Sequence, residues 1–314
     1  MSTILLAIQG WEPEAWLTRF RALAGKREVR LWPETGNPKD INYVCVWKQP
    51  AGLLATLPNL KAIFSLGAGV DHLLQDALLP KVPIARIVDP DLTQRMTGYV
   101  VMHALLHQRK MKAYEAQRRE KRWRDLYERP PSAVRVGLMG MGVLGSAAAA
   151  GLKNVGFQVI GWSRSAKKIT GVKVFSGDAG LDPFLAQTDI LVVLLPLTPA
   201  TKGILNYDLF KKLARDGVLG GPVLINAGRG GLQVEDDIRH ALQDGTLSGA
   251  SLDVFETEPL PLSSAFWEHP KVYMTPHNAA SSDPRALVEN IMAQIERHER
   301  GEPLENLVDR KLGY

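Results

Sequence analysis

The chain of 314 residues has little cysteine and no long hydrophobic run, and both absences narrow what the protein can be. Its single cysteine, Cys45, excludes an intrachain disulfide and suits a reducing compartment. Because Cys45 lies within an apolar run, we interpret it as a core residue rather than a nucleophile. No apolar run approaches the roughly 18 residues that span a bilayer, and the first residues lack the basic segment of a signal peptide. We therefore expect a cytoplasmic protein with no membrane partner.

Neither sign of charge is in large excess, because the formal net charge is only +5. Residues 109–129 account for all of it, with nine basic residues against four acidic ones. Acids interleaved with bases are typical of a solvated helix face or a subunit arm, and not of a nucleic-acid footprint. We therefore expect no nucleic-acid partner. The hydrophobic content of 45% is that of an ordinary globular protein, and the length allows two domains.

The chain does have two series of short apolar runs, separated by helical or loop stretches and without an internal repeat. This alternation predicts an α/β fold with two doubly wound parallel-sheet domains. Strands are expected in the first series at residues 4–8, 43–47, 62–66 and 84–88. In the second series they are expected near Val136, Val159, Leu191, Leu224, Leu252 and Tyr273. A helical stretch at 285–300 follows, and its return to the first series would make that domain discontinuous.

The second series begins with a glycine-rich loop between a strand and a helix. Gly140, Gly142 and Gly145 follow the strand-like run 134–139 and lead into an alanine-rich helix at 144–155. In such a fingerprint the first glycine permits the tight turn, the second lets the backbone approach a pyrophosphate, and the third lets helix and strand pack closely. The pyrophosphate then lies at the helix N-terminus. We predict a dinucleotide site formed by Gly140, Met141, Gly142, Val143, Leu144 and Gly145.

An acidic residue is missing where an enzyme that uses NAD has one, at the end of the next strand. The residues after strand 157–162 are Ser163, Arg164, Ser165, Ala166, Lys167 and Lys168. An NAD enzyme places Asp or Glu there to bind the ribose hydroxyls, whereas a guanidinium binds a 2′-phosphate through a bidentate fork. The alternative interpretation is an ordinary basic surface turn. We predict NADPH as the cofactor, with NADH used more weakly, and a phosphate site made by Ser163, Arg164, Ser165 and Lys167.

Three polar residues follow strand-like runs in the last third of the chain. Arg229 follows 223–225, Glu258 follows 250–255, and His277 follows 272–274. Residues just past the ends of parallel strands gather in one crevice. An arginine binds a carboxylate, a histidine transfers a proton near neutral pH, and a glutamate holds that imidazole. Each residue alone could be a surface charge or part of a turn, but in this order behind the fingerprint they predict a site that reduces a 2-oxo acid.

Six ordered motifs carry a resemblance to a known family. They occupy residues 67–72, 140–145, 195–203, 225–230, 253–259 and 276–280. With these motifs the chain resembles the D-isomer-specific 2-hydroxyacid dehydrogenases, and most of all their NADPH-dependent glyoxylate/hydroxypyruvate reductase branch. The resemblance runs from about Trp47 to Leu307. It implies reduction of glyoxylate to glycolate, or of hydroxypyruvate to D-glycerate.

The resemblance also implies how the chain is organised. It places a Rossmann cofactor domain at residues 98–285 and a flavodoxin-like, discontinuous substrate domain at 1–97 and 286–314. It implies a homodimer formed through the cofactor domains, with the basic segment near Trp123 as the dimer arm. It implies no metal.

The resemblance assigns roles to individual residues. The implied catalytic residues are Arg229, which binds the carboxylate and polarises the 2-oxo group, His277, which donates the proton, and Glu258, which holds His277. The implied substrate contacts are Trp47, Ala68, Gly69, Arg229 and His277, with the backbone amides of Ala68 and Gly69 as an anion nest. The further implied cofactor contacts are Leu195, Pro196, Ala227 and Asp253, the last of them near the nicotinamide.

Two positions depart from the family pattern. Thr97-Gly98-Tyr99 stands where many relatives carry a glutamate, and Trp47 precedes Lys48-Gln49-Pro50 where the reductase branch often has a histidine and two prolines. These departures leave open a larger 2-oxo acid as the substrate. Formate and phosphite dehydrogenases share the fold, but the former have glutamine at the position of Glu258. Nucleotide-sensing corepressor scaffolds keep the three residues without catalysis, yet they carry long extra tails.

Overall fold

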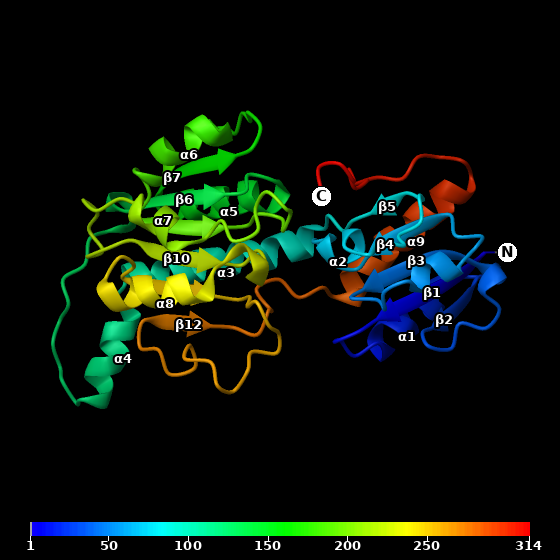
Figure 1. Cartoon of the computed structure of the whole chain (residues 1–314), viewed down its shortest axis with the longest axis horizontal. Coiled ribbons are helices and arrows are strands. Elements are labelled where there is room, and N and C mark those ends of the chain that lie inside the picture. Colours follow the sequence, from blue (N-terminus) through cyan, green and yellow to red (C-terminus); the bar gives the residue numbers. More distant parts are fainter. Residues whose placement is uncertain (1) are drawn as a thin grey trace. The chain divides into compact units, whose positions relative to one another are not determined.

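The computed structural model describes residues 2–314, which fall into two compact units. Unit 1 consists of the residues up to Leu92 together with Ser282–Tyr314, and unit 2 consists of Thr93–Ser281. Each unit is built around its own parallel sheet (Figure 1). The predicted α/β fold with two parallel-sheet domains is confirmed.

Unit 1 contains, within the described residues, a five-stranded sheet in the order β2-β1-β3-β4-β5. Its strands are β1 (Thr3–Ile8), β2 (Glu28–Leu31), β3 (Ile41–Trp47), β4 (Ala62–Ser65) and β5 (Ile84–Ala85). Its helices are α1 (Glu14–Leu23), α2 (Asp71–Leu74) and α9 (Pro284–Glu299), with 3-10 turns η1 (Pro38–Asp40) and η2 (Leu53–Thr56). β1 is buried along its whole length, which explains its almost uniformly apolar sequence. The strand order is the flavodoxin-like one.

Unit 2 contains, within the described residues, a seven-stranded sheet in the order β12-β11-β10-β9-β6-β7-β8. Its strands are β6 (Arg135–Met139), β7 (Gln158–Ser163), β8 (Lys173–Ser176), β9 (Ile190–Val193), β10 (Val223–Asn226), β11 (Gly249–Leu252) and β12 (Val272–Met274). Its helices are α3 (Pro90–Gln108), which begins in unit 1, α4 (Met111–Arg119), α5 (Val143–Asn154), α6 (Gly177–Leu185), α7 (Tyr207–Lys211) and α8 (Glu235–Asp244), with 3-10 turns η3 (Pro131–Ala133) and η4 (Gly230–Leu232). From β8 to β11 this is the Rossmann order, extended by β12.

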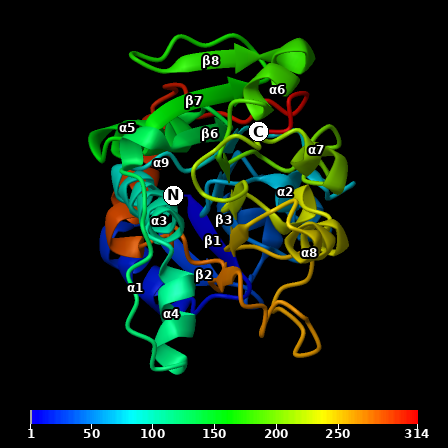
Figure 2. The same ribbon diagram turned by 90° about the vertical axis from the view of Figure 1, so that its left-hand side faces the viewer.

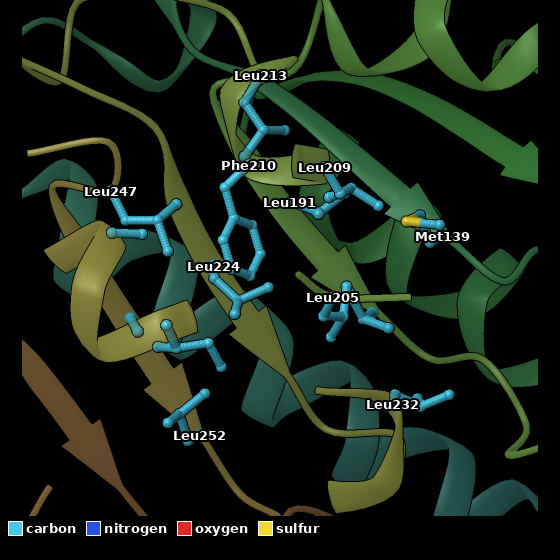
Figure 3. Packing of buried hydrophobic residues seen from close by; sticks show 14 of the residues in the cluster. Met139, Leu191, Leu205, Leu209, Phe210, Leu213, Leu224, Leu232, Leu247 and Leu252 are labelled. Carbon is cyan, nitrogen blue, oxygen red and sulfur yellow. The ribbon is translucent and has the colours of Figure 1, made fainter. Parts of the chain in front are cut away.

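The sheet of unit 2 is covered by apolar clusters on both faces. In β9, Leu191 belongs to the cluster beneath α6, α7 and α8, and Val192 belongs to the cluster beneath α3 and α5. Figure 3 shows the first cluster, where Phe210 of α7 lies beside Leu224 of β10. Successive strand residues point to opposite faces, so a strand buried on both faces must be apolar throughout. The doubly wound architecture follows from that pattern.

Two strands, β2 and β8, were not expected from the sequence. Both lie at an edge of their sheets, and each is a four-residue run that begins with a charged residue, Glu28 or Lys173. An edge strand pairs on one side only and tolerates charge, so its pattern is not that of a buried strand. The strand expected at 84–88 is also shorter, because β5 pairs only at Ile84 and Ala85.

The interior of unit 1 contains the single cysteine of the chain. Cys45 lies in β3 and is fully buried, and burial raises the pKa of its thiol above the usual range, so the core interpretation is confirmed. None of the helices in residues 2–314 combines the length and apolar content that crossing a bilayer requires.

Two buried histidines attach α3 to the sheet of unit 2. His103 Nδ1 and His107 Nε2 each lie 2.8 Å from Ser251 Oγ on β11. Desolvation lowers the pKa of His103 to about 4 and that of His107 to about 3, and for His107 the neighbouring His103 and Lys112 add to the effect. Both rings are therefore neutral at pH 7.

This neutrality predicts a loss of stability in mild acid. In the unfolded chain these histidines titrate near their ordinary pKa of 6.5, so the unfolded state binds more protons than the folded state between pH 6.5 and 4. The free energy of unfolding should therefore decrease as the pH is lowered through this window. At roughly pH 5.5 the decrease should be about 1 kcal/mol for each histidine. Thermal unfolding at about pH 7.5 and 5.5 measures the change. His107→Gln should flatten the dependence, and an unchanged slope in that variant would contradict the assignment.

Candidate active site

The predicted polar residues of unit 2 lie just beyond the carboxyl ends of adjacent parallel strands. Arg229 follows β10, Asp253 and Glu258 follow β11, and His277 follows β12. β10, β11 and β12 are neighbours in the sheet, so these loops emerge side by side. This edge is where open α/β sheets bind their ligands.

His277 and Glu258 form a hydrogen-bonded pair. His277 Nδ1 lies 2.8 Å from Glu258 Oε2, and both side chains are about three-quarters buried, with exposed fractions of 28% and 22%. Ionised carboxylate oxygens only accept hydrogen bonds, so Nδ1 carries the proton on the side of Glu258. Glu258 is held in turn, because its Oε1 accepts from the amide of Phe255 at 3.2 Å. The pair is oriented for acid–base chemistry at Nε2.

The loop of Arg229 is fixed by buried amides. Asn226 Nδ2 donates to the carbonyl of Arg229 at 3.2 Å and to Gln233 Oε1 at 2.9 Å, while Asn226 Oδ1 accepts from the amide of Gly228 at 3.0 Å. The half-buried Arg229 donates through Nη1 to the carbonyl of Gly228 at 2.8 Å. The backbone that presents the guanidinium is thereby rigid.

The loops of Arg229 and Glu258 are packed together. Gln233 Nε2 donates to the carbonyl of Val254 at 3.0 Å. A Cβ at Gly230 would lie only 1.8 Å from the carbonyl oxygen of Phe255, so only glycine allows this approach. A side-chain hydrogen bond and a close backbone approach therefore join the segments that carry Arg229 and Glu258.

The glycine-rich loop has the shape that a dinucleotide requires. Gly140 has a φ of +104°, and a Cβ at Gly145 would lie 1.8 Å from the carbonyl oxygen of Gly140. Among the described atoms none lies within 4 Å of where a Cβ at Gly142 would be. Gly142 is also the N-cap of α5 and offers no side-chain cap, so the first amides of this 12-residue helix can meet an anion. The loop fits a bound pyrophosphate.

The residues predicted to bind the 2′-phosphate follow β7 directly. Ser163 is buried at the strand end, and its Oγ donates to the carbonyl of Ser165 at 2.7 Å. Lys167 reaches over the glycine-rich loop, with Nζ 2.9 Å from the carbonyl oxygen of Met141. Arg164 and Ser165 are exposed, and the chain has no acid between Ser163 and Asp178. The basic loop and the glycine-rich loop therefore form one continuous region.

The remaining predicted cofactor contacts lie along the same edge. Leu195 and Pro196 follow β9, Ala227 follows β10, and Leu195 and Ala227 are buried. The amide of Ala227 donates to the carbonyl of Val193 at 3.2 Å, which continues the pairing of β10 with β9. Asp253 is 2% exposed and accepts hydrogen bonds from the turn that follows β12.

The predicted substrate residues of unit 1 lie at the carboxyl end of its own sheet. Trp47 ends β3 and stacks on Trp11, with ring centroids 4.5 Å apart and planes 15° apart. A Cβ at Gly67 would lie 2.1 Å from the Trp47 ring, so the turn after β4 packs directly on the indole. In that turn Ser65 Oγ donates to the carbonyl oxygens of Gly67, at 2.9 Å, and Gly69, at 3.2 Å. The indole and the Gly-Ala-Gly turn are rigid, and Ala68 and Gly69 are partly exposed.

Some supporting residues were not predicted from the sequence. Gln233 binds both Asn226 and Val254, and Thr275 binds Asp253. Thr275 adjoins the Pro-His motif and could have been suspected on that ground, whereas nothing in the sequence marks Gln233. Within residues 2–314 there is no group of three or more His, Cys, Asp or Glu side chains placed to hold a metal ion.

A Rossmann sheet with a glycine-rich loop and a His–Glu pair at its carboxyl edge defines a dinucleotide-dependent dehydrogenase. Residues 101–279 match the family model for the D-isomer specific 2-hydroxyacid dehydrogenase, NAD binding domain. Together with the similarity to curated relatives over nearly the whole chain, this match shows that the protein belongs to the D-isomer-specific 2-hydroxyacid dehydrogenase family.

Relatives of this chain carry more specific names. A glyoxylate/hydroxypyruvate reductase A of Escherichia fergusonii is 41% identical over 305 residues, which cover 95% of this chain and 96% of the relative. An NADPH-dependent glyoxylate/hydroxypyruvate reductase of Sinorhizobium meliloti, solved with NADP and sulfate, is 50% identical with a TM-score of 0.96 and full coverage of both chains. A family member of Xanthobacter autotrophicus, solved with NADPH and MES, is 39% identical with a TM-score of 0.94, covering 100% of this chain and 99% of the other.

Proposed function

We propose that the protein reduces glyoxylate or hydroxypyruvate with NADPH, giving glycolate or D-glycerate. The observation that carries this proposal is the His277–Glu258 pair at the carboxyl edge of a dinucleotide-type sheet. The names of the relatives in Escherichia fergusonii and Sinorhizobium meliloti support the substrate class. The basic loop after β7 supports the phosphorylated form of the cofactor.

In the proposed mechanism, the residues of this chain bind the substrate and supply a proton. NADPH, when bound, supplies the hydride for the 2-oxo carbon. Arg229 binds the substrate carboxylate and polarises the oxo group, while His277 donates the proton from Nε2 to the oxo oxygen. Glu258 holds the ring through Nδ1 and stabilises its charged form.

We propose further contacts from both units. In unit 1 the amides of Ala68 and Gly69 bind the same carboxylate, and the stacked Trp47 keeps the substrate small. In unit 2 the glycine-rich loop would hold the pyrophosphate, and Asp253 would lie near the nicotinamide. The other proposed cofactor contacts are Met141, Val143, Leu144, Leu195, Pro196 and Ala227.

We also propose a homodimer formed through the cofactor domains. α4 and the irregular chain after it extend away from the sheet of unit 2 in both Figure 1 and Figure 2. Trp123 and Tyr127 on this stretch are largely exposed. Large exposed aromatic side chains are expected in a subunit arm, because a partner subunit covers them in the dimer. We propose the cytoplasm as the location of the protein.

Steady-state rates with glyoxylate, hydroxypyruvate, pyruvate and phenylpyruvate, each with NADPH and with NADH, test the proposed function. The proposal requires the highest kcat/KM for glyoxylate or hydroxypyruvate with NADPH. A preference for phenylpyruvate would contradict the proposed substrates and indicate a larger 2-oxo acid. Absence of turnover with every 2-oxo acid would favour the nucleotide-sensing scaffold.

The cofactor preference gives a separate prediction. Arg164→Ala should lower kcat/KM for NADPH by about 10- to 150-fold, because a charge-assisted contact to a phosphate is worth about 1.5 to 3 kcal/mol. The value for NADH should barely change, and it serves as the internal control. Ser163→Asp should place an acceptor for the ribose hydroxyls at the end of β7 and reverse the preference. Equal wild-type efficiency with both cofactors would contradict the proposed role of this loop.

A further inference from the structure

The turn that carries His277 is held by a buried carboxylate. His277 has a φ of +52°, which is rare for a residue other than glycine and needs support from its surroundings. Asp253, 2% exposed, supplies it: Oδ1 accepts from Thr275 Oγ1 at 2.6 Å and from the amides of Asn278 at 2.9 Å and Ala279 at 3.1 Å. The Asp253 carbonyl also accepts from the amide of His277 at 2.8 Å. One residue therefore binds the chain on both sides of His277.

A tyrosine of α3 completes this arrangement. Tyr99 Oη lies 2.9 Å from Thr275 Oγ1, and Tyr99 is 7% exposed. The Asp253 carboxylate can only accept, so Thr275 donates its single proton to it. Tyr99 must then donate to Thr275. The direction of both hydrogen bonds is therefore fixed: Tyr99 donates to Thr275, and Thr275 donates to Asp253.

The same face of α3 is attached to β11 at a second point. Tyr99, His103 and His107 are spaced by four residues, so they share one side of the helix. His103 and His107 bind Ser251 of β11, two residues before Asp253. Apolar packing is non-directional, whereas these buried hydrogen bonds define one register between helix and strand. The position of Thr275 is thus tied to that of α3.

We propose that Tyr99 and Thr275 are positioning residues for His277, acting through Asp253 and the turn after β12. The proposal rests on the proposed role of His277 as the proton donor. We call the hydrogen bonds from Tyr99 to Thr275 and from Thr275 to Asp253 the relay. With the relay intact, Nε2 of His277 is held where the oxo oxygen arrives. Without it the turn relaxes and the proton is delivered less often, while the bound cofactor is unaffected.

Three single variants test the relay by steady-state kinetics. Thr275→Val keeps the shape and removes the hydroxyl, and it should lower kcat by about 10- to 100-fold, the effect of a displacement near 1 Å. Thr275→Ser restores the hydroxyl and should stay within about 3-fold of wild type. Tyr99→Phe should lower kcat by about 2- to 10-fold, and KM for NADPH should change by less than about 2-fold in all variants.

Tyr273→Phe is the matched control. Tyr273 contacts the same histidines of α3, but its buried hydroxyl has no hydrogen-bond partner among residues 2–314. Its removal should leave kcat within about 2-fold of wild type. Equal effects of Tyr99→Phe and Tyr273→Phe, or no rescue by serine, would overturn the proposal. Should Thr275→Val fail to fold, Tyr99→Phe, which deletes one oxygen atom, carries the test.

A double variant separates positioning from general damage. If Thr275 acts through His277, then Thr275→Val in a His277→Ala background should cost less than about 2-fold more. A full 10- to 100-fold further loss would show that Thr275 acts otherwise and would overturn the relay. Near-normal activity of His277→Ala itself would instead refute the proposed function on which the relay rests.

Discussion

Replacing His277 with alanine is expected to lower kcat by about 10²- to 10⁴-fold, the usual contribution of a positioned general acid. The reason is its geometry: Nδ1 lies 2.8 Å from Glu258 Oε2, and Nε2 is the nitrogen proposed to donate the proton. Cofactor affinity should change little, because the dinucleotide loop belongs to β6 and α5. Steady-state kinetics with glyoxylate and NADPH, together with NADPH binding by fluorescence, measure both quantities.

Two further variants serve as comparisons for the loss of activity in His277→Ala. Glu258→Gln keeps an acceptor for Nδ1 but removes the charge that favours the imidazolium, so it should lose less than His277→Ala and lose it mainly in kcat. His240→Ala is the matched control, since His240 is exposed on α8. Activity of His277→Ala within about 3-fold of wild type would be incompatible with a general acid at this position.

Replacing Arg229 with lysine is expected to restore little of what alanine removes. The proposed bidentate contact with the carboxylate is worth about 1.5 to 3 kcal/mol, or roughly 10- to 150-fold in kcat/KM. A lysine retains the charge but not the planar fork. Arg229→Ala should raise KM for the 2-oxo acid and also lower kcat, because the same group polarises the oxo bond.

The control for Arg229 is Arg239, which lies on α8 and pairs with Asp236 at 2.7 Å with half of its side chain exposed. Arg239→Ala should leave kcat and KM unchanged, as expected for a surface ion pair. Kinetics of Arg229→Lys equal to those of wild type would argue against bidentate binding, and a change in Arg239→Ala would show that loss of any nearby cation matters.

The buried strands and the loops that follow them could be predicted from sequence because their signals are local. The apolar runs of β1, β6 and β10 mark strands buried on both faces, and the glycines at 140 and 145 mark a turn with little space for side chains. The parallel order then brings the residues after β10, β11 and β12 to one edge. For this reason His277 and Glu258, 19 residues apart, could be predicted to meet.

The supporting contacts could not be predicted because their partners are distant in sequence. Tyr99 and Thr275 are separated by 176 residues, and His103 and Ser251 by 148. A tyrosine or a histidine within an apolar helix has the same local pattern whether its polar atom is bonded or not. β2 and β8 were not predicted for a related reason. Each is an edge strand that pairs on one side only, and the sequence does not show which strand lies at an edge.

The chirality of the product is the decisive test of the proposed mechanism, because it depends on hydride and proton reaching opposite ends of one oxo bond in a fixed arrangement. Wild-type protein should be incubated with hydroxypyruvate and NADPH, and the glycerate formed should be resolved on a chiral column. The proposed mechanism requires D-glycerate alone, formed in equal amount to the NADPH consumed, and its loss in His277→Ala. Formation of L-glycerate, a racemic product, or NADPH oxidation without glycerate would contradict it.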